Sequence, residues 1–288
     1  MSSKLKLQRS SSILNYNKYP SIISTSLVEG QLSKIKRQIH RHNDRVEILF
    51  MAAGGGIYFI DGENYEVEKG DIIVYNSGVI HEEMIDLEKG VSMYGFGVKN
   101  LSIKGMGVNQ LIQKGKTPII KTRDRYYEFK NLFSMIYKYS LEDGIDAVEL
   151  VNNLIMAIII LINDISFNNE KLNTSNKQKL GESIRNYIDE HLYTDISLKS
   201  ISDAFNLSKY YVAHLYKEVT GYSPVQYIIR RRIGDAQTML LHTDDSIINI
   251  AMNVGFNSVN HFHCTFVKIV GISPGKYRKI WKTNEIVL

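Results

Sequence analysis

The chain has 288 residues, of which 44% are hydrophobic and 23% are charged, and its net charge is +5 with a pI near 9.0. This length allows two domains with a core each, and this composition excludes a fibrous or broadly disordered protein. The single cysteine, Cys264, excludes an intrachain disulfide and fits a reducing cytoplasm. Because Cys264 lies in a helical run, we expect it to pack in a core rather than to act as a nucleophile.

The N-terminal stretch MSSKLKLQRSSSILNYNKYP is basic, but no apolar run follows it, so no secretory signal is expected. The most apolar stretch of the chain, LVNNLIMAIIILINDI at residues 150–165, is too short to cross a bilayer and contains three asparagines. We therefore predict a buried helix there and a cytoplasmic protein.

Residues 33 to about 100 form short runs in which β-branched and aromatic residues alternate with polar ones: SKIKRQIHRH, RVEILFMA, GIYFIDG, YEVEKG, DIIVYNSG and VSMYGFGV. Turn signals such as Asp61-Gly62 and Lys69-Gly70 separate these runs at the spacing of a sandwich or barrel. The pattern predicts a small β domain. Gly54-Gly55-Gly56 lies between two such runs rather than at the start of a helix, so we expect a turn and not a phosphate-binding loop.

Histidines and a glutamate recur in this β region as HxH(x)4E(x)6G, with His40, His42 and Glu47, and His81 follows downstream. His40 and His42 share one face of a strand, so they could meet Glu47 and His81 inside a barrel. Three imidazoles and a carboxylate suit iron, manganese, nickel or zinc. The alternative is that the four residues, with Tyr75, only line a ligand pocket.

These two histidine-containing segments resemble the two signatures of the cupin family, a small double-sheet jelly roll. Asn76 stands where the second signature usually has proline, and Ile85 where it usually has asparagine. The resemblance implies a ligand-sensing domain, and it also permits a metal-dependent enzyme such as a dioxygenase or isomerase.

From residue 123 to 165 the apolar period becomes helical. These helices carry more apolar side chains than one small barrel needs, which favours a homodimer interface; simple packing against the barrel remains open. Residues 166–176 are polar and rich in Asn and Ser, which is typical of a linker. The expected division is a sensing and dimerisation domain at 1–165, the linker, and a third segment at 177–288.

The segment 177–288 predicts an all-helical domain with a basic surplus, 14 Lys and Arg against 10 Asp and Glu. Ser197, Ser208 and Ser246 stand at expected N-caps, and Gly221, Gly255 and Gly271 at expected helix ends. Together with the β domain, this gives an α+β fold of two domains, an N-terminal cupin-like β jelly roll with a helical dimerisation segment and a C-terminal all-α domain.

A phrase occurs twice in this domain, GYSPVQY from Gly221 and GISPGKY from Gly271, and the match extends upstream at the same displacement. Each copy, at about 197–220 and 246–270, predicts helix, tight turn and helix, the helix-turn-helix that places its second helix in the major groove. Between the copies, residues 224–242 predict a spacer helix of about 28 Å, close to the roughly 34 Å between successive major grooves. We therefore predict binding to double-stranded DNA.

The DNA-contacting residues are expected on the second helix of each unit, where polar groups can reach phosphates or base edges. In the first unit they are Lys209, Tyr210, Ala213, His214 and Lys217. In the second unit they are Asn257, Ser258, Asn260, His261 and Lys268. Phe205, Leu215, Phe256, Phe262 and Phe266 are expected in the core.

The residues from about 177 to 279 resemble the double helix-turn-helix domain of AraC/XylS-type transcription regulators, with Ile250-Ala251, Gly255-Phe256 and GISPGKYR from Gly271 as the best markers. The resemblance implies base contacts by Tyr210, Ala213 and His214 and, in the second unit, by Val259, Asn260 and Cys264. Cys264 stands where arginine is common and Val267 where a basic residue is usual, so we expect the second unit to contribute less to sequence recognition.

Arg230, Arg231 and Arg232 are consecutive in the spacer helix and must point in different directions. The resemblance favours a structural role for Arg232, and we expect the other two to face solvent or phosphate.

The sequence thus predicts a cytoplasmic transcription regulator that is not an enzyme. Its expected partners are promoter DNA, a small-molecule effector in the barrel, a second copy of the chain and RNA polymerase, as for an activator. A divalent metal in the barrel is the one cofactor considered. The alternatives are a metal-dependent cupin enzyme fused to a DNA-binding domain and a constitutive DNA-binding protein with an inactive sensor.

Overall fold

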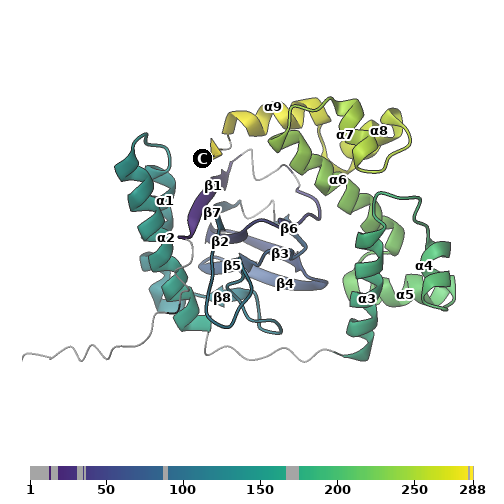
Figure 1. Ribbon diagram of the computed structural model, residues 1–288, viewed down its shortest axis with the longest axis horizontal. Coiled ribbons are helices and arrows are strands. Elements are labelled where there is room, and N and C mark those ends of the chain that lie inside the picture. Colours follow the sequence, from purple (N-terminus) through teal and green to yellow (C-terminus); the bar gives the residue numbers. More distant parts are fainter. Residues whose placement is uncertain are drawn as a thin grey trace, which may run out of the picture.

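The computed structural model describes residues 13, 19–30, 35, 37–86, 90–166, 175–284 and 286–287. Most of the predicted linker, 166–176, lies outside these residues. Figure 1 shows a β domain in the centre, a pair of helices against one side of it, and the C-terminal helices around the other side. The predicted α+β architecture, a cupin-like β domain followed by an all-helical domain, is confirmed.

The β domain consists of two antiparallel sheets, one of six strands in the order β8-β5-β2-β7-β1-β9 and one of three in the order β4-β3-β6. The strands are β1 Ser21–Glu29, β2 Val46–Ala53, β3 Gly55–Ile60, β4 Glu63–Glu68, β5 Asp71–Tyr75, β6 His81–Ile85, β7 Ser92–Lys99, β8 Ile119–Lys121 and β9 Ile286–Val287. β9 comes from the C-terminal end of the chain and pairs with β1 at the sheet edge.

Strand β2 is buried on both faces, which explains its almost continuous apolar sequence. Leu49 and Met51 point into the barrel, where they pack with Tyr58 of β3. Ile48 and Phe50 point outward and pack against the helical pair. The predicted turns at Asp61-Gly62 and Lys69-Gly70 are present, with positive φ at Asp61, Gly62 and Gly70.

One predicted strand is wrong. In SKIKRQIHRH, the described part from residue 37 forms only an isolated bridge, between His40 and His81. β1, β6 and β8 were not predicted as strands, because their turn signals and alternation are weaker than those of their neighbours.

The helical pair covers the outer face of the larger sheet and consists of α1 Tyr126–Tyr139 and α2 Ile145–Ser166, after a short 3-10 turn η2 at Arg123–Arg125. The helix predicted at residues 150–165 is present, but it begins five residues earlier and is fully buried only along the face that meets the sheet. α2 has 22 residues, and among the described residues its part Ile145–Ile165 is the one helix long and apolar enough to span a membrane, with 28% of its most apolar window buried. Val151, Ile155 and Ile162 face the sheet, whereas Ile145 is 85% exposed.

The C-terminal domain consists of α3 Asn176–Glu190, α4 Leu198–Ala204, α5 Lys209–Thr220, α6 Pro224–His242, α7 Ile247–Asn253, α8 Val259–Val270 and α9 Pro274–Asn284. The predicted N-caps Ser197, Ser208 and Ser246 each accept a backbone N–H three residues on. Gly221 and Gly271 end α5 and α8 with φ of 79° and 92°, a left-handed conformation that glycine adopts without strain.

Of the predicted core residues, Leu215, Phe256, Phe262 and Phe266 are buried and Phe205 is half-buried against the first unit. Cys264 is exposed on α8, so the prediction that it packs in a core is wrong.

Arg232 connects the two helix pairs, as its predicted structural role requires. Its guanidinium donates to the carbonyl oxygens of Leu192 at 2.9 Å and Thr194 at 2.8 Å, just before α4, and of Gly255 at 2.8 Å, in the turn between α7 and α8. One side chain on α6 therefore links the entrance of the first helix pair to the turn of the second.

We expect Arg232→Ala to lower the free energy of unfolding by about 2 kcal/mol, because three carbonyls lose a charged donor. Urea denaturation followed by circular dichroism measures the change. Lys199→Ala, at an exposed position on α4, is the control and should change the stability by less than about 0.5 kcal/mol. Equal midpoints for the two variants would contradict the connecting role of Arg232.

Candidate functional site

The first candidate DNA-binding surface lies on α5. Val212, Leu215 and Tyr216 pack inward, and the opposite face carries the predicted DNA-contacting residues. Of these, Lys209, Tyr210, His214 and Lys217 are exposed and Ala213 is half-buried. The rings of Tyr210, which is 80% exposed, and His214 stack one turn apart with centroids 6.0 Å apart. α5 thus presents a face that carries two aromatic rings and two lysines.

The second candidate surface lies on α8 and in the turn before it. Asn257, Ser258, Asn260, His261 and Lys268 are all exposed, whereas Phe262 and Phe266 on the other face are buried. Ser258 also caps the helix, since its hydroxyl accepts the His261 N–H at 3.4 Å. His261 packs edge-on against Phe256, with ring centroids 5.4 Å apart.

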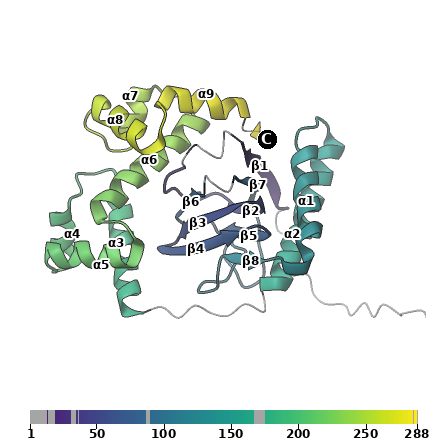
Figure 2. The same ribbon diagram turned by 180° about the vertical axis from the view of Figure 1, so that it is seen from behind.

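Both surfaces lie on the side of the molecule away from the helical pair α1 and α2. Figures 1 and 2 show the units that contain α5 and α8 beyond the barrel when seen from α1 and α2. α6 has the 19 residues expected of the spacer. The fold therefore joins the two helix-turn-helix units through one helix.

The structure brings His40, His42, Glu47 and His81 together inside the barrel, with one potential ligand atom of each lying within 4.8 Å of the others. We call these four residues the quartet. Glu47 Oε2 lies 3.6 Å from His42 Nε2 and 3.5 Å from His81 Nε2. The quartet comes from three places in the chain, the segment before β2, β2 itself and the start of β6, which the sequence pattern alone cannot bring together.

Hydrogen bonds orient two of the imidazoles. Nδ1 of His40 lies 2.8 Å from the Gln38 carbonyl oxygen, and Nδ1 of His81 lies 3.0 Å from the Val79 carbonyl oxygen. A carbonyl only accepts, so each Nδ1 carries the proton and each Nε2 keeps a lone pair. Nε2 of both histidines and Oε2 of Glu47 are buried and have no hydrogen-bond partner.

Burial keeps His40 and His42 neutral. It lowers the pKa of His42 to about 3 and holds the pKa of His40 well below its usual value. Burial alone would raise the pKa of Glu47, but the His81 and His42 rings beside its carboxylate outweigh this effect and lower it. Imidazoles beside one carboxylate, with inward-facing lone pairs on His40 and His81 that no described group satisfies, have the chemistry of a site for a divalent transition metal.

Tyr75, the fifth predicted ligand-binding residue, lies beside the quartet but does not enlarge the site. Its ring stacks on His81 with centroids 3.7 Å apart and an interplanar angle of 12°. The compactness of the quartet leaves room for an ion rather than for a molecule of many atoms.

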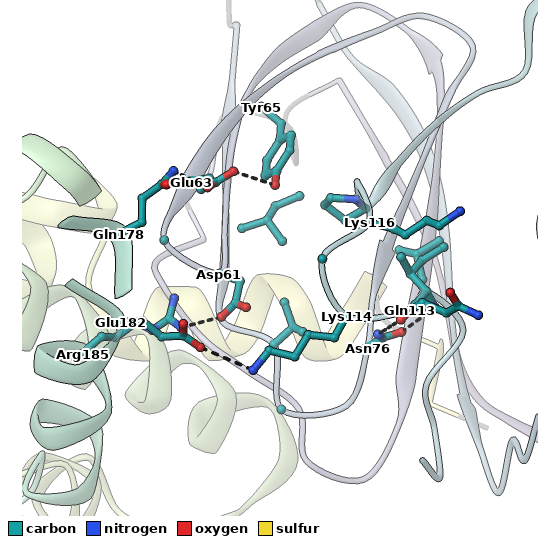
Figure 3. A pocket seen from close by; sticks show the side chains of 18 of the residues that line it. Asp61, Glu63, Tyr65, Asn76, Gln113, Lys114, Lys116, Gln178, Glu182 and Arg185 are labelled. Atoms are coloured by element: carbon teal, nitrogen blue, oxygen red, sulfur yellow. Dashed lines mark hydrogen bonds and ion pairs between the residues drawn. The ribbon is translucent and has the colours of Figure 1, made fainter. Parts of the chain in front are cut away.

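A separate cavity of about 670 Å³ lies between the barrel and α3, and none of the quartet residues lines it. Figure 3 shows how the two domains meet there: Asp61 from the β3–β4 turn pairs with Arg185 of α3 at 2.8 Å, and Lys114 lies 3.7 Å from Glu182. Nε of Arg185 is buried without a hydrogen-bond partner. The sequence did not indicate this cavity, because its walls come from segments more than 100 residues apart.

The prediction for two of the three arginines of α6 is wrong. Arg231 is 1% exposed, and its Nη1 donates to Asp235 Oδ1 at 2.9 Å and to the Ile39 carbonyl oxygen at 3.2 Å. Nη1 of Arg230 donates to Glu82 Oε1 at 2.8 Å. Both side chains therefore hold α6 against the β domain instead of facing solvent or phosphate.

Comparison with known proteins agrees with this division of the chain. Residues 201–280 match the family described as helix-turn-helix domain, and residues 29–88 match the cupin domain. The uncharacterized HTH-type transcriptional regulator YdiP of Escherichia coli strain K12 is 26% identical over 246 residues, which cover 84% of this chain and 81% of that protein. The HTH-type transcriptional activator RhaS of Escherichia fergusonii is 26% identical over 245 residues, 83% of this chain and 86% of that protein.

Two further proteins are similar over different lengths. The MmsAB operon regulatory protein of Pseudomonas aeruginosa is 21% identical over 279 residues, 91% of this chain and 84% of that protein. Among solved structures, ToxT from Vibrio cholerae is 12% identical with a TM-score of 0.47, over 90% of this chain and 98% of that one.

The fold and its two exposed surfaces define a transcription regulator with a helix-turn-helix DNA-binding domain. Within that class, its helix-turn-helix domain with a cupin domain on the N-terminal side is similar to that of AraC/XylS-type regulators.

Proposed function

We propose that this regulator binds operator DNA sequence-specifically through both helix-turn-helix units and acts without catalysing a reaction. The observation that carries the proposal is the pair of exposed polar faces on α5 and α8, in two units that α6 joins along the chain. Lys209, Lys217 and Lys268 supply phosphate contacts, and the expected base contacts come from Tyr210, Ala213 and His214 in the first unit and from Asn257, Ser258, Asn260 and His261 in the second. The relatives' names describe regulators, which supports a cytoplasmic protein that is not an enzyme.

A small-molecule effector is the proposed input, and RNA polymerase the proposed protein partner of an activator. The cavity between the barrel and α3 offers the effector about 670 Å³, a size typical of ligand pockets. Because both domains line it, a ligand there would contact both and could shift their arrangement by its differential affinity.

A second proposal concerns the quartet, which we propose holds a divalent metal ion. The three buried atoms without partners, Nε2 of His40 and His81 and Oε2 of Glu47, support it. When bound, the ion would supply a fixed positive charge between the two histidine-bearing segments. The same four residues permit a metal-dependent enzyme, and a turnover that His42→Ala abolishes would favour that alternative.

A third proposal concerns assembly: the outer face of α2 forms a homodimer interface. Ile145, Val148 and Ile160 are 85%, 49% and 49% exposed on this helix. With Tyr127 and Leu141 of the adjacent α1 region, at 72% and 52%, they form an apolar face that a second copy of the same face would cover symmetrically.

DNA binding should weaken steeply with salt, because each phosphate contact releases counterions. With a fluorescent duplex of random sequence, we expect log affinity to fall linearly with log salt, and Lys217→Ala to reduce the slope by about 1. Lys99→Ala, on an exposed position of β7, should leave the slope unchanged. Binding that is indifferent to salt would count against the proposal.

For the metal site, we expect isothermal titration with Zn²⁺ or Co²⁺ to show one equivalent bound. His42→Ala should weaken the affinity by on the order of 100-fold, since a ligand is lost from a small set. The control is His263→Ala, at an exposed histidine of α8, which should bind as the unchanged chain does. Equal metal affinity in both variants would remove the quartet from consideration.

For the dimer, sedimentation equilibrium of the full chain should give twice the chain mass of 33.0 kDa. Val148→Glu should give monomers, because it places a charge in the apolar face. Asp146→Ala, on the same helix, should remain dimeric. A chain that stays monomeric at tens of micromolar would contradict the proposed interface.

A further inference from the structure

Residues 37–42, which we call the strap, cross the barrel opening between the quartet and the C-terminal domain. The strap joins the barrel through few backbone hydrogen bonds: His40 and His81 exchange two, at 3.0 and 2.9 Å, and the Gly78 N–H donates to the His42 carbonyl oxygen at 2.7 Å. No described strand continues it on either side of this isolated bridge. By its backbone alone, the strap is weakly held.

The strap contacts the quartet site through some of its residues and the C-terminal domain through others. His40 and His42 belong to the quartet. Gln38 and Ile39 are 1% and 0% exposed, and they are covered from the other side by α6. Arg41 lies 3.6 Å from Asp189 of α3.

Three hydrogen bonds join the strap to α6. The Gln38 N–H donates to Gln237 Oε1 at 2.8 Å, and Gln38 Oε1 accepts from Arg230 Nη1 at 2.7 Å. The Ile39 carbonyl oxygen accepts from Arg231 at 3.2 Å. These contacts lie in the middle part of α6, the helix that joins the two helix-turn-helix units along the chain.

Strand β6 is divided in the same way between the quartet and the C-terminal domain. His81 belongs to the quartet, and the next residue, Glu82, accepts from Arg230 Nη1 and from the Tyr222 hydroxyl, both at 2.8 Å. On both segments, therefore, one residue faces the quartet and its neighbour holds the C-terminal domain.

Gly234 makes this approach possible. A Cβ at that position would lie 2.0 Å from the Ile39 carbonyl oxygen and 3.2 Å from the Gln38 carbonyl oxygen, so no larger residue fits while α6 is docked. An alanine would suit α6 itself, because alanine favours a helix by up to about 1 kcal/mol over glycine. The substitution thus separates docking from the folding of the helix.

We propose that a divalent metal ion in the quartet pins the strap to the barrel and thereby docks α6, so that metal occupancy sets how the DNA-binding domain is held. The proposal rests on the metal site proposed above. The ion would join the two segments whose outer neighbours, Gln38, Ile39 and Glu82, carry α6. Without it, the segments keep only the bridge and leave buried ligand atoms unsatisfied.

Hydrogen–deuterium exchange of the full chain, with Zn²⁺ and after chelation, tests this directly. We expect chelation to speed exchange at least about tenfold in peptides that cover the strap and the middle of α6, because local opening exposes their amides. Peptides from α1 should not change. Gly234→Ala should bind Zn²⁺ as the unchanged chain does, yet exchange rapidly in α6 with or without metal. Val225→Ala, exposed at the start of α6, should behave as the unchanged chain.

The outcomes separate this inference from the metal site. Zn²⁺ that binds at the quartet without changing exchange in α6 would overturn the docking proposal and leave the metal site standing. Absence of binding, measured by titration on the same sample, would overturn both and leave the DNA-binding function. Metal-dependent protection that persists in His42→Ala would place its cause outside the quartet and also overturn the proposal.

Discussion

The close approach of α6 to the Ile39 carbonyl oxygen is the constraint on which the arrangement of the two domains depends. A glycine at 234 leaves no side chain between helix and strap, and buried Arg231 donates to the same carbonyl. Since Arg231 is 1% exposed, its charge requires partners, which Asp235 and Asp189 supply at 2.9 and 3.5 Å. Both carboxylates belong to the C-terminal domain, on α6 and α3, so the charge stays paired within that domain, and it is the hydrogen bond to the Ile39 carbonyl that ties Arg231 to the β domain.

The docking of α6 also joins the hydrophobic cores of the two domains. Ile39, Phe59 and Ile80 of the β domain lie in one apolar cluster with Ile184 of α3, Tyr227 of α6 and Val212 of the first helix-turn-helix unit. Arg232, on the next position of α6, ties that unit to the turn of the second. A displacement of the strap would therefore affect both DNA-binding surfaces through one helix. By linkage, a ligand that binds one arrangement of the domains more tightly shifts the protein toward that arrangement, which in turn has the higher affinity for the ligand.

Local signals account for what the sequence could predict. Caps such as Ser208 and the left-handed Gly221 act within one turn of a helix, so the spacer helix and the helix pairs could be predicted from the sequence. The quartet was predictable as a set because the spacing of His40, His42 and Glu47 resembles known signatures. Contacts between distant segments leave no local trace: neither the orphaned Nε of Arg185 nor the reason for glycine at 234 can be found in any single window of sequence.

The wrong predictions have one physical cause: the exposure of a side chain depends on which distant segment of the chain packs against it. Three adjacent arginines suggested a basic surface, but Glu82 and the Ile39 carbonyl accept hydrogen bonds from two of them, while the apolar helix expected inside is fully buried only along one face of α2. The pairing of these arginines within the protein changes which side chains can attract DNA phosphates. While α6 is docked, Arg230 and Arg231 are used within the protein, so attraction for phosphate must come from the exposed lysines of α5 and α8. Undocking would free Arg230 from Gln38 and Glu82 of the β domain and would add a cation to the DNA-facing domain. The salt dependence of DNA binding therefore reports on docking as well as on contact, since each additional phosphate contact steepens it.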